Sequence, residues 1–126
     1  MSSAYVDSSC LVAIALHEHN AAALSRRLTS FGEIMASTLL EAELRSTLAR
    51  EAKPLDEELL RRFSWILPER SLGAEIARVL DAGYVRGADC LHLASALYIT
   101  ADPATTTFLT LDSRQRAVAK ALGFKT

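Results

Sequence analysis

The sequence has no excess of basic charge and no long hydrophobic run. Its 126 residues contain 14 Lys and Arg against 15 Asp and Glu, a formal net charge of −1. A duplex-binding protein usually carries a basic footprint, which is missing here. No apolar run reaches the length of about 20 residues that a membrane-spanning helix needs, and no signal-like core follows a basic N-terminal region. We therefore expect a cytoplasmic protein that makes no use of a membrane.

Several sequence patterns of known chemistry are also missing. There is no C-x-x-C or paired-histidine spacing, so we expect no zinc site. The two cysteines, Cys10 and Cys90, lie in apolar surroundings and are predicted to be buried small hydrophobes without a disulfide. There is no Gly-rich P-loop, and no Asp-x-Asp pair of the kind that haloacid-dehalogenase-like enzymes need. No repeat or linker interrupts the chain, which predicts a single domain over residues 1–126.

What is present is a series of short apolar segments and amphipathic segments. We expect strands over residues 4–6, 33–36 and 107–111, with brief further strands over 66–69 and 124–126. We expect helices over residues 9–17, 20–29, 38–53, 55–67, 71–82, 88–97 and 113–122. These elements indicate an α/β fold.

Two of the predicted strands end in an aspartate. Asp7 follows the first strand, and either Ser8 or Ser9 is expected to cap the next helix. A carboxylate at the tip of a central strand lies where open α/β sheets bind ligands, although Asp7 alone is equally explained as a helix N-cap. Asp112 follows the last long strand in the same way. If the two strands are parallel neighbours, both aspartates emerge at the same edge of the sheet.

The predicted helix after residue 37 carries two glutamates with different explanations. Glu41 matches a capping box with Thr38 and can pair with Arg45 one turn later, so it has two structural uses. Glu43 has neither use, and it points elsewhere because residues two apart on a helix face away from each other. A functional role is therefore favoured for Glu43.

The helix predicted over residues 88–97 is small and apolar apart from three polar residues, so it is expected to be largely buried. Asp89, His92 and Ala96 share one of its faces. An aspartate near a helix start is also explained as a favourable charge for the helix dipole. His92 is favoured as a hydrogen-bonded core histidine over a catalyst.

Together the chain offers four acids that each stand out from an apolar background. Four carboxylates in one pocket repel each other unless they are protonated or neutralised by cations. Mg²⁺ or Mn²⁺ is the natural counter-charge, because hard ions prefer oxygen ligands. Such ions activate water and bind phosphate, which is the chemistry of phosphodiester hydrolysis and is compatible with a net charge near zero.

These residues give the chain its resemblance to a known family. It resembles the PIN-domain ribonucleases, in particular the VapC toxins of toxin–antitoxin pairs, over nearly its whole length. The similarity rests on residues 5–9, 37–45, 89–96 and 109–114, of which the third segment is the most specific. It implies a PIN-like three-layer α/β/α sandwich with a central, mostly parallel four- to five-stranded sheet.

The resemblance also implies a site and a reaction. The family's catalytic, metal-binding acids map onto Asp7, Glu43, Asp89 and Asp112, with Mg²⁺ or Mn²⁺ activating the water that cleaves RNA. The supporting polar residues that orient carboxylates or water match Ser8, Ser9 and Thr110. Arg114 is placed to touch a substrate phosphate or to form a surface salt bridge. Cys10 and Cys90 depart from the family pattern by replacing a small residue such as alanine.

The family also implies partners. VapC toxins form homodimers and are held by a cognate VapB-type antitoxin, for which residues 20–67 would form the groove unless they only fill the core. Two alternatives remain: a PIN nuclease in RNA processing or on DNA without an antitoxin, and a catalytically silent PIN-fold binding module. The intact set of four acids argues against the silent module. The lack of an appended RNA-binding module favours the toxin.

Overall fold

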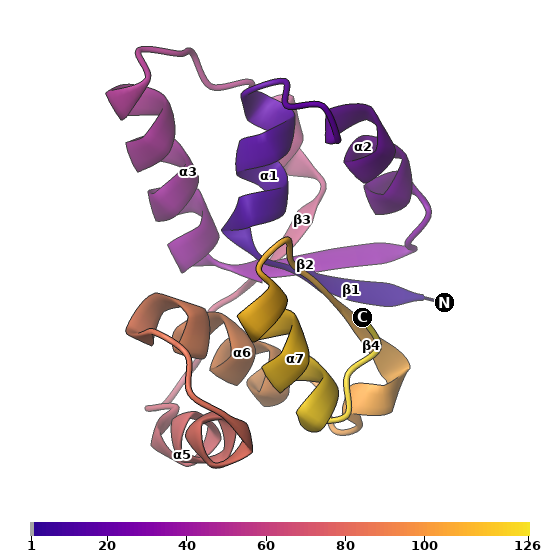
Figure 1. Ribbon diagram of the computed structural model, residues 1–126, viewed down its shortest axis with the longest axis vertical. Helices are drawn as coiled ribbons and strands as arrows, with labels where there is room; N and C mark the ends of the chain where they lie inside the picture. The colour runs from indigo at the N-terminus through magenta and orange to yellow at the C-terminus, as the bar shows by residue number, and fades with distance from the viewer. Residues whose placement is uncertain (1) are drawn as a thin grey trace.

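A four-stranded sheet lies between two layers of helices in the computed structural model, which describes residues 2–126 (Figure 1). All strand pairs are parallel, and the strand order is β3-β2-β1-β4. The predicted three-layer α/β/α sandwich is therefore confirmed, and β1 and β4 are the parallel neighbours on which the placement of Asp7 and Asp112 at one edge depends. The strands are β1 (Ser3–Val6), β2 (Glu33–Ser37), β3 (Phe63–Ile66) and β4 (Thr106–Leu109).

The helices divide between the two faces of the sheet (Figure 1). One layer contains α1 (Ser8–Ala15), α2 (Ala21–Thr29), α3 (Thr38–Arg50) and the short α4 (Glu58–Arg61). The other contains α5 (Gly73–Ala82), α6 (Gly87–Ile99) and α7 (Ser113–Ala121), and a 3-10 turn, η1 (Pro103–Thr105), precedes β4. None of the helices within residues 2–126 combines the length and hydropathy that crossing a bilayer requires.

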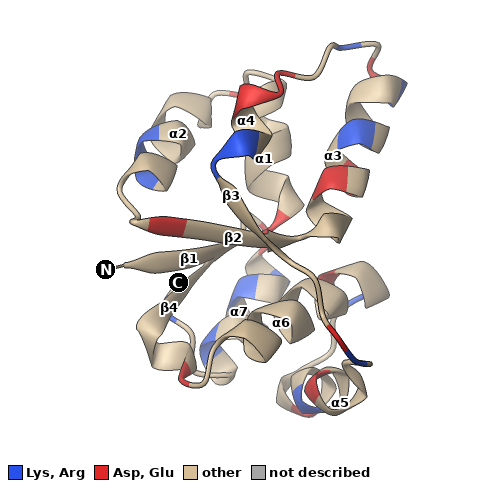
Figure 2. Cartoon of the chain, turned by 180° about the vertical axis from the view of Figure 1, so that it is seen from behind, with Lys and Arg blue, Asp and Glu red and all other residues tan. Residues whose placement is uncertain are grey.

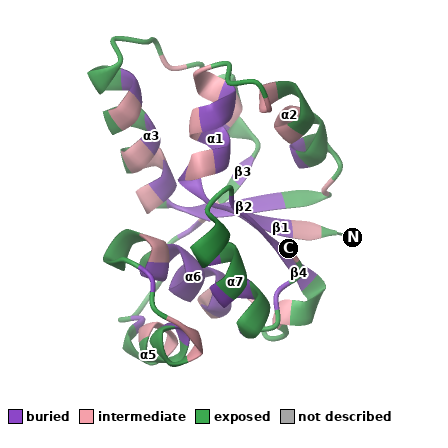
Figure 3. Ribbon diagram, viewed as in Figure 1, coloured by how far each residue is buried: buried purple, intermediate pink, exposed green. Residues whose placement is uncertain are grey.

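Each face of the sheet has its own hydrophobic core. In β1, Tyr5 packs into the core with α5, α6 and α7, whereas Ala4 and Val6 pack into the core with α1 and α3. Successive strand residues point to opposite faces, so a strand covered on both sides must be apolar throughout. Strands β1 and β2 are buried except at their first residues, β4 is buried throughout, the edge strand β3 exposes Ser64, and most of α6 is buried as predicted (Figure 3).

Charged residues are almost confined to the helices and loops (Figure 2). Glu33, the first residue of β2, is the only charged residue within the four strands. A parallel sheet buried on both faces has no solvated side on which charges can be placed. The acids that follow the strands are therefore at the sheet edge rather than in it.

The helix predicted over residues 55–67 is wrong. Only Glu58–Arg61 is helical, and the chain then enters β3, which pairs with β2 from Ile34 opposite Phe63. The apolar spacing of this segment fits a helix, but its aromatic residues and the open edge of β2 favour a strand. The brief strand expected over residues 66–69 is this same strand placed too late, since β3 ends at Ile66.

Helix starts were predicted less accurately than helix existence. Asp7, rather than Ser8 or Ser9, occupies the N-cap position of α1, and Ser37, rather than Thr38, occupies that of α3. The capping box on Glu41 is therefore wrong. Its other use is confirmed, because Glu41 accepts from Arg45 Nε at 2.6 Å. At the C-terminus, a single bridge between Thr107 and Lys125 replaces the predicted strand over 124–126.

Candidate active site

The strand order places a topological switch point between β1 and β4. From β1 the chain runs outward through β2 to β3, and it returns on the other side of β1 as β4. Open α/β sheets bind ligands outside the carboxyl ends of the strands at such a point. Asp7 follows β1 directly, and Thr110 follows β4 directly. The backbone N–H of Asp7 donates to the carbonyl of Leu109 at 3.0 Å, which fixes the two strand ends together.

Asp7 is a buried carboxylate held by hydroxyl groups. Its side chain is almost inaccessible, and its Oδ2 accepts from Ser9 Oγ at 2.8 Å and from Thr110 Oγ1 at 2.7 Å. Ser8 Oγ lies 3.3 Å from its Oδ1. Although Asp7 stands at the N-cap position of α1, its side chain accepts no capping hydrogen bond from the helix. Helix capping therefore does not explain this carboxylate.

Glu43 reaches the same place from α3. Its Oε1 accepts from Ser8 Oγ at 3.0 Å and lies 2.7 Å from His92 Nε2. The same imidazole nitrogen lies 3.7 Å from Asp7 Oδ1, so Ser8 and His92 both stand between the two carboxylates. The hydrogen bond from His92 lowers the pKa of Glu43, against the opposing effect of partial burial. Glu43 was predicted to lack the structural uses of Glu41. The contacts agree, because Glu41 pairs with Arg45 at the surface whereas Glu43 contacts Ser8 and His92.

Asp89 and Asp112 form a second pair. They line a hollow of about 360 Å³ together with Arg86 and Arg114. Partial burial raises the pKa of Asp89, and the negative charges of Asp7 and Asp112 raise it further. Asp112 also has a structural use, because its Oδ1 accepts from the backbone N–H of Gln115 at 2.8 Å and caps α7.

Two buried side chains at this edge make contacts that were not anticipated from the sequence. His92 was predicted as a hydrogen-bonded core histidine, which is confirmed, but its partner is the carboxylate of Glu43. Gln115 is fully buried in α7, with its Oε1 at 2.7 Å from Thr110 Oγ1 and its Nε2 donating to the carbonyl of Asp89 at 3.2 Å. The sequence gives one indication of Gln115: it is a polar residue one helical turn after Asp112, which itself follows a strand.

The four acids thus lie at one edge of the sheet as two pairs. Within residues 2–126, no three His, Cys, Asp or Glu side chains approach each other closely enough to form a complete metal cage. A protein usually holds Mg²⁺ with one or two carboxylates and leaves the remaining positions to water. The donor set is all carboxylate oxygen, and the pKa of Asp89 is raised first by burial and then by the negative charges of Asp7 and Asp112. Each pair therefore fits a hydrated divalent ion.

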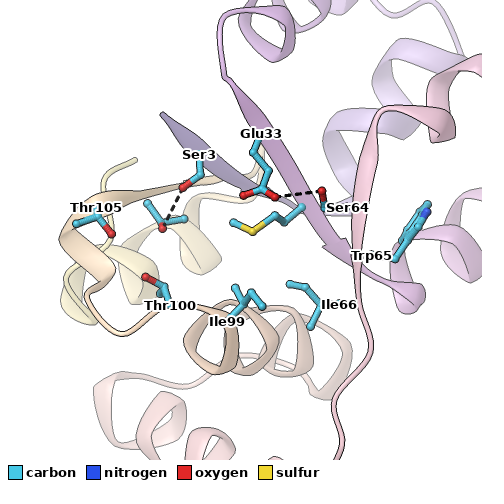
Figure 4. A pocket seen from close by; sticks show the side chains of 10 residues that line it. Ser3, Glu33, Ser64, Trp65, Ile66, Ile99, Thr100 and Thr105 are labelled. Atoms are coloured by element: carbon cyan, nitrogen blue, oxygen red, sulfur yellow. Dashed lines mark hydrogen bonds between the residues drawn. The ribbon is translucent and has the colours of Figure 1, made fainter. Parts of the chain in front are cut away.

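A comparably large hollow lies at the opposite edge of the sheet (Figure 4). Its volume is about 370 Å³, and its lining includes Ser3, Glu33 and Thr106, the first residues of β1, β2 and β4. Glu33 accepts from Ser64 Oγ at 3.1 Å, and it is the only carboxylate in the lining. This hollow does not offer the paired carboxylates found at the carboxyl edge.

Comparison with known proteins assigns the chain to a family. The PIN domain family matches residues 4–121. This chain belongs to the PIN domain family. PIN domains are generally nucleases and usually use divalent metals, so a nuclease fold is established for the chain. No curated protein matches the sequence.

Both cysteines of this PIN domain are buried free thiols, as predicted. Burial raises the pKa of the Cys90 thiol and raises that of Cys10 to about 12, helped by the negative charge of Asp7. Because the thiolate is the reactive form, neither side chain has the character of a nucleophile or a redox sensor. Their role is packing.

Proposed function

We propose that the protein is a Mg²⁺- or Mn²⁺-dependent endoribonuclease that hydrolyses RNA phosphodiester bonds. The observation that carries the proposal is the gathering of Asp7, Glu43, Asp89 and Asp112 at the switch point of a PIN-domain sheet. When bound, the metal supplies a Lewis acid and an activated water. The remaining chemistry belongs to the residues that hold the metal and the substrate.

Asp7 and Glu43 are the more rigid pair. Three serine and threonine hydroxyls converge on Asp7, which fixes its carboxylate in one orientation. The hydrogen bonds of Glu43 all go to Oε1, so its Oε2 has no bond within residues 2–126 and is available as a ligand. In this proposal Ser8, Ser9 and Thr110 are orienting residues. Such partners typically change metal affinity by 10–100-fold when they are removed.

Asp89 and Asp112 would complete the site from their own hollow, which they line together with two arginines. Arg86 and Arg114 are exposed, and neither forms an ion pair within residues 2–126. A guanidinium binds phosphate oxygens through two parallel hydrogen bonds, so these side chains suit a phosphodiester next to the acids. Arg86 is therefore a second candidate, besides Arg114, for contact with a substrate phosphate.

We further propose that the enzyme is a VapC-type toxin that forms a homodimer and binds a VapB-type antitoxin. Two hollows of about 190 and 290 Å³ support a partner groove in the expected part of the chain. They are lined by residues of α1 and α2 and by the segment over residues 54–62, including Ile14, Leu28 and Leu59. Copurification with a small protein encoded beside the gene tests this. A monomer that recovers no such partner would favour a PIN nuclease without an antitoxin.

Activity is tested with single-stranded and structured RNA, and with DNA, in the presence of Mn²⁺. We expect cleavage of RNA, abolished by excess EDTA and by Asp89→Asn. Asp81→Asn, an exposed aspartate of α5 outside the site, is the matched control. Cleavage that persists at full rate in excess EDTA would refute the metal-dependent mechanism. If the protein cleaves DNA in preference to RNA, the alternative of a PIN nuclease that acts on DNA replaces the proposal.

A further inference from the structure

A line of buried polar groups extends away from Glu43 into the core. His92 Nε2 lies 2.7 Å from Glu43 Oε1, and His92 Nδ1 lies 2.7 Å from the hydroxyl of Tyr5. The Tyr5 hydroxyl in turn accepts from the backbone N–H of Ser37 at 3.3 Å. Both His92 and Tyr5 are completely inaccessible to solvent. A polar line of this kind in a hydrophobic core is costly unless every member is satisfied.

For a neutral imidazole beside an ionised Glu43, the donors and acceptors in this line have one consistent assignment. The backbone N–H of Ser37 can only donate, so the Tyr5 oxygen accepts there and its proton is free for another partner. Within residues 2–126, that partner is His92 Nδ1. Nδ1 is then an acceptor, so the proton of the neutral imidazole is on Nε2 and points at Glu43. The carboxylate of Glu43 is the acceptor at the end of the line.

The line is also mechanically fixed. The Tyr5 ring stacks on Phe108 with centroids 5.2 Å apart and planes inclined by 8°, and it meets the His92 ring edge-on at 5.8 Å. Tyr5 belongs to β1, His92 to α6 and Glu43 to α3. The end of this line is therefore tied to the central strand and to both helical layers. A shift of α3 or of α6 would therefore disturb the contact between His92 and the Glu43 carboxylate.

We propose that His92 is a positioning residue for Glu43, held by Tyr5 in the tautomer that donates from Nε2. By occupying Oε1, the imidazole leaves Oε2 as the oxygen presented to a metal ion. The part of this inference that concerns metal binding rests on the proposed nuclease function. The part that concerns the tautomer and the orientation of Glu43 stands on the contacts alone. A purely structural role for His92 would leave metal affinity unchanged in variants that fold.

The tautomer is measured by long-range proton–nitrogen correlation NMR on the metal-free chain. The spectrum of His92→Gln assigns the His92 signals, and the exposed His17 and His19 serve as internal references. We expect a pyridine-like Nδ1 and a protonated, pyrrole-like Nε2 for His92, and a shifted Nδ1 resonance in Tyr5→Phe. A protonated Nδ1 would overturn the assignment. So would nitrogen resonances that are averaged between the two tautomers, as those of the exposed histidines are.

Positioning is measured by calorimetric titration with Mn²⁺. We expect His92→Leu to weaken binding by about 10–100-fold, as removal of a partner behind a metal ligand usually does. His92→Gln should recover much of this loss, because its amide can donate from the position of Nε2. His19→Gln, at an exposed site, is the matched control and should bind as the unaltered chain does.

A double-mutant cycle separates action through Glu43 from a general loss of structure. If His92 acts through Glu43, His92→Leu should weaken Mn²⁺ binding no further when Glu43→Ala is already present. Additive losses, or equal affinity for His92→Leu and the unaltered chain, would overturn the positioning role. If the unaltered chain binds no Mn²⁺, the nuclease proposal fails, and the NMR result alone decides the inference about the tautomer and Glu43. If His92→Leu does not fold, the cycle is run with Tyr5→Phe, which removes the hydroxyl that holds His92 in its tautomer.

Discussion

Replacing Asp7 by asparagine keeps the shape of the side chain and removes its charge. The asparagine Oδ1 can still accept from Ser9 and Thr110, while its amide nitrogen takes the place of Oδ1 opposite Ser8 Oγ. Hydrogen bonds to a charged acceptor contribute about 1.5–3 kcal/mol and those to a neutral one about 0.5–1.5 kcal/mol. The two short bonds should therefore lose about 2 kcal/mol together.

Relief of charge repulsion opposes that loss. Asp7 is one of the charges that raise the pKa of Asp89, so removing it favours the folded state at neutral pH. We expect the free energy of unfolding to fall by at most about 2 kcal/mol. For a chain of this length, this corresponds to a fall in Tm of about 8 °C. RNA cleavage should fall by on the order of a thousandfold, since metal activation provides several kcal/mol of transition-state stabilisation.

The two measurements are a thermal melt and a single-turnover cleavage assay in Mn²⁺, with Asp81→Asn as the control. A folded Asp7→Asn variant that cleaves RNA at the rate of the unaltered chain would refute the assignment of Asp7 to the site. A variant that loses cleavage only because it unfolds would show that the hydroxyl contacts of Asp7 contribute far more to stability than the hydrogen-bond energies above allow.

Three further predictions concern stability and reactivity. Asp89→Asn should raise Tm at pH 7 by the equivalent of at most about 1 kcal/mol, because burial and neighbouring charges raise the pKa of Asp89 and its ionised form destabilises the fold. The gain should shrink as the pH falls below the raised pKa of Asp89 and vanish below about pH 4, where the carboxyl is protonated in both states; an undiminished gain at pH 3 would contradict this. Gly83→Ala should cost about 1–3 kcal/mol, since its Cβ would meet Val118 Cγ2 at 2.9 Å, whereas Gly87→Ala, with open space around its Cβ, should not. Cys10 should resist alkylation by iodoacetamide in the folded protein and react after unfolding in urea, as seen by mass spectrometry; rapid labelling of the folded chain would be inconsistent with a pKa of about 12.

The layers of the fold could be predicted because local patterns were strong. Residues 4–6 are apolar at every position and Phe108–Leu109 continue the pattern in β4, as expected of strands covered on both faces. The helix containing Asp89 was recognised as buried from its small apolar residues. The strand β3 could not be predicted, because Phe63–Ile66 is too short to show a period, and its identity depends on the open edge of β2, which belongs to a distant part of the sequence.

The acids proposed for the site could be selected from the sequence, whereas the contacts between them could not. Asp7 and Asp112 follow strands, and Glu43 lacks a local partner, so each could be selected from its neighbours. That His92 donates to Glu43 depends on how α3 and α6 approach each other across the sheet edge, which no spacing within either helix encodes. The division of the acids into two pairs likewise depends on side-chain contacts made by Ser8 and Gln115.

The bridge between Thr107 and Lys125 has a practical consequence for handling the protein. Lys125 N–H donates to the carbonyl of Thr106 at 3.1 Å, so the last residues lie beside the start of β4, and Ser3 is paired with Thr106 in the adjacent β1 (Figure 1). An affinity tag or a fluorophore attached at either terminus would therefore leave from the rim opposite Asp7. Attachment there keeps the approach to the carboxylates open, and labels at both termini would report on each other rather than on events at the carboxylates.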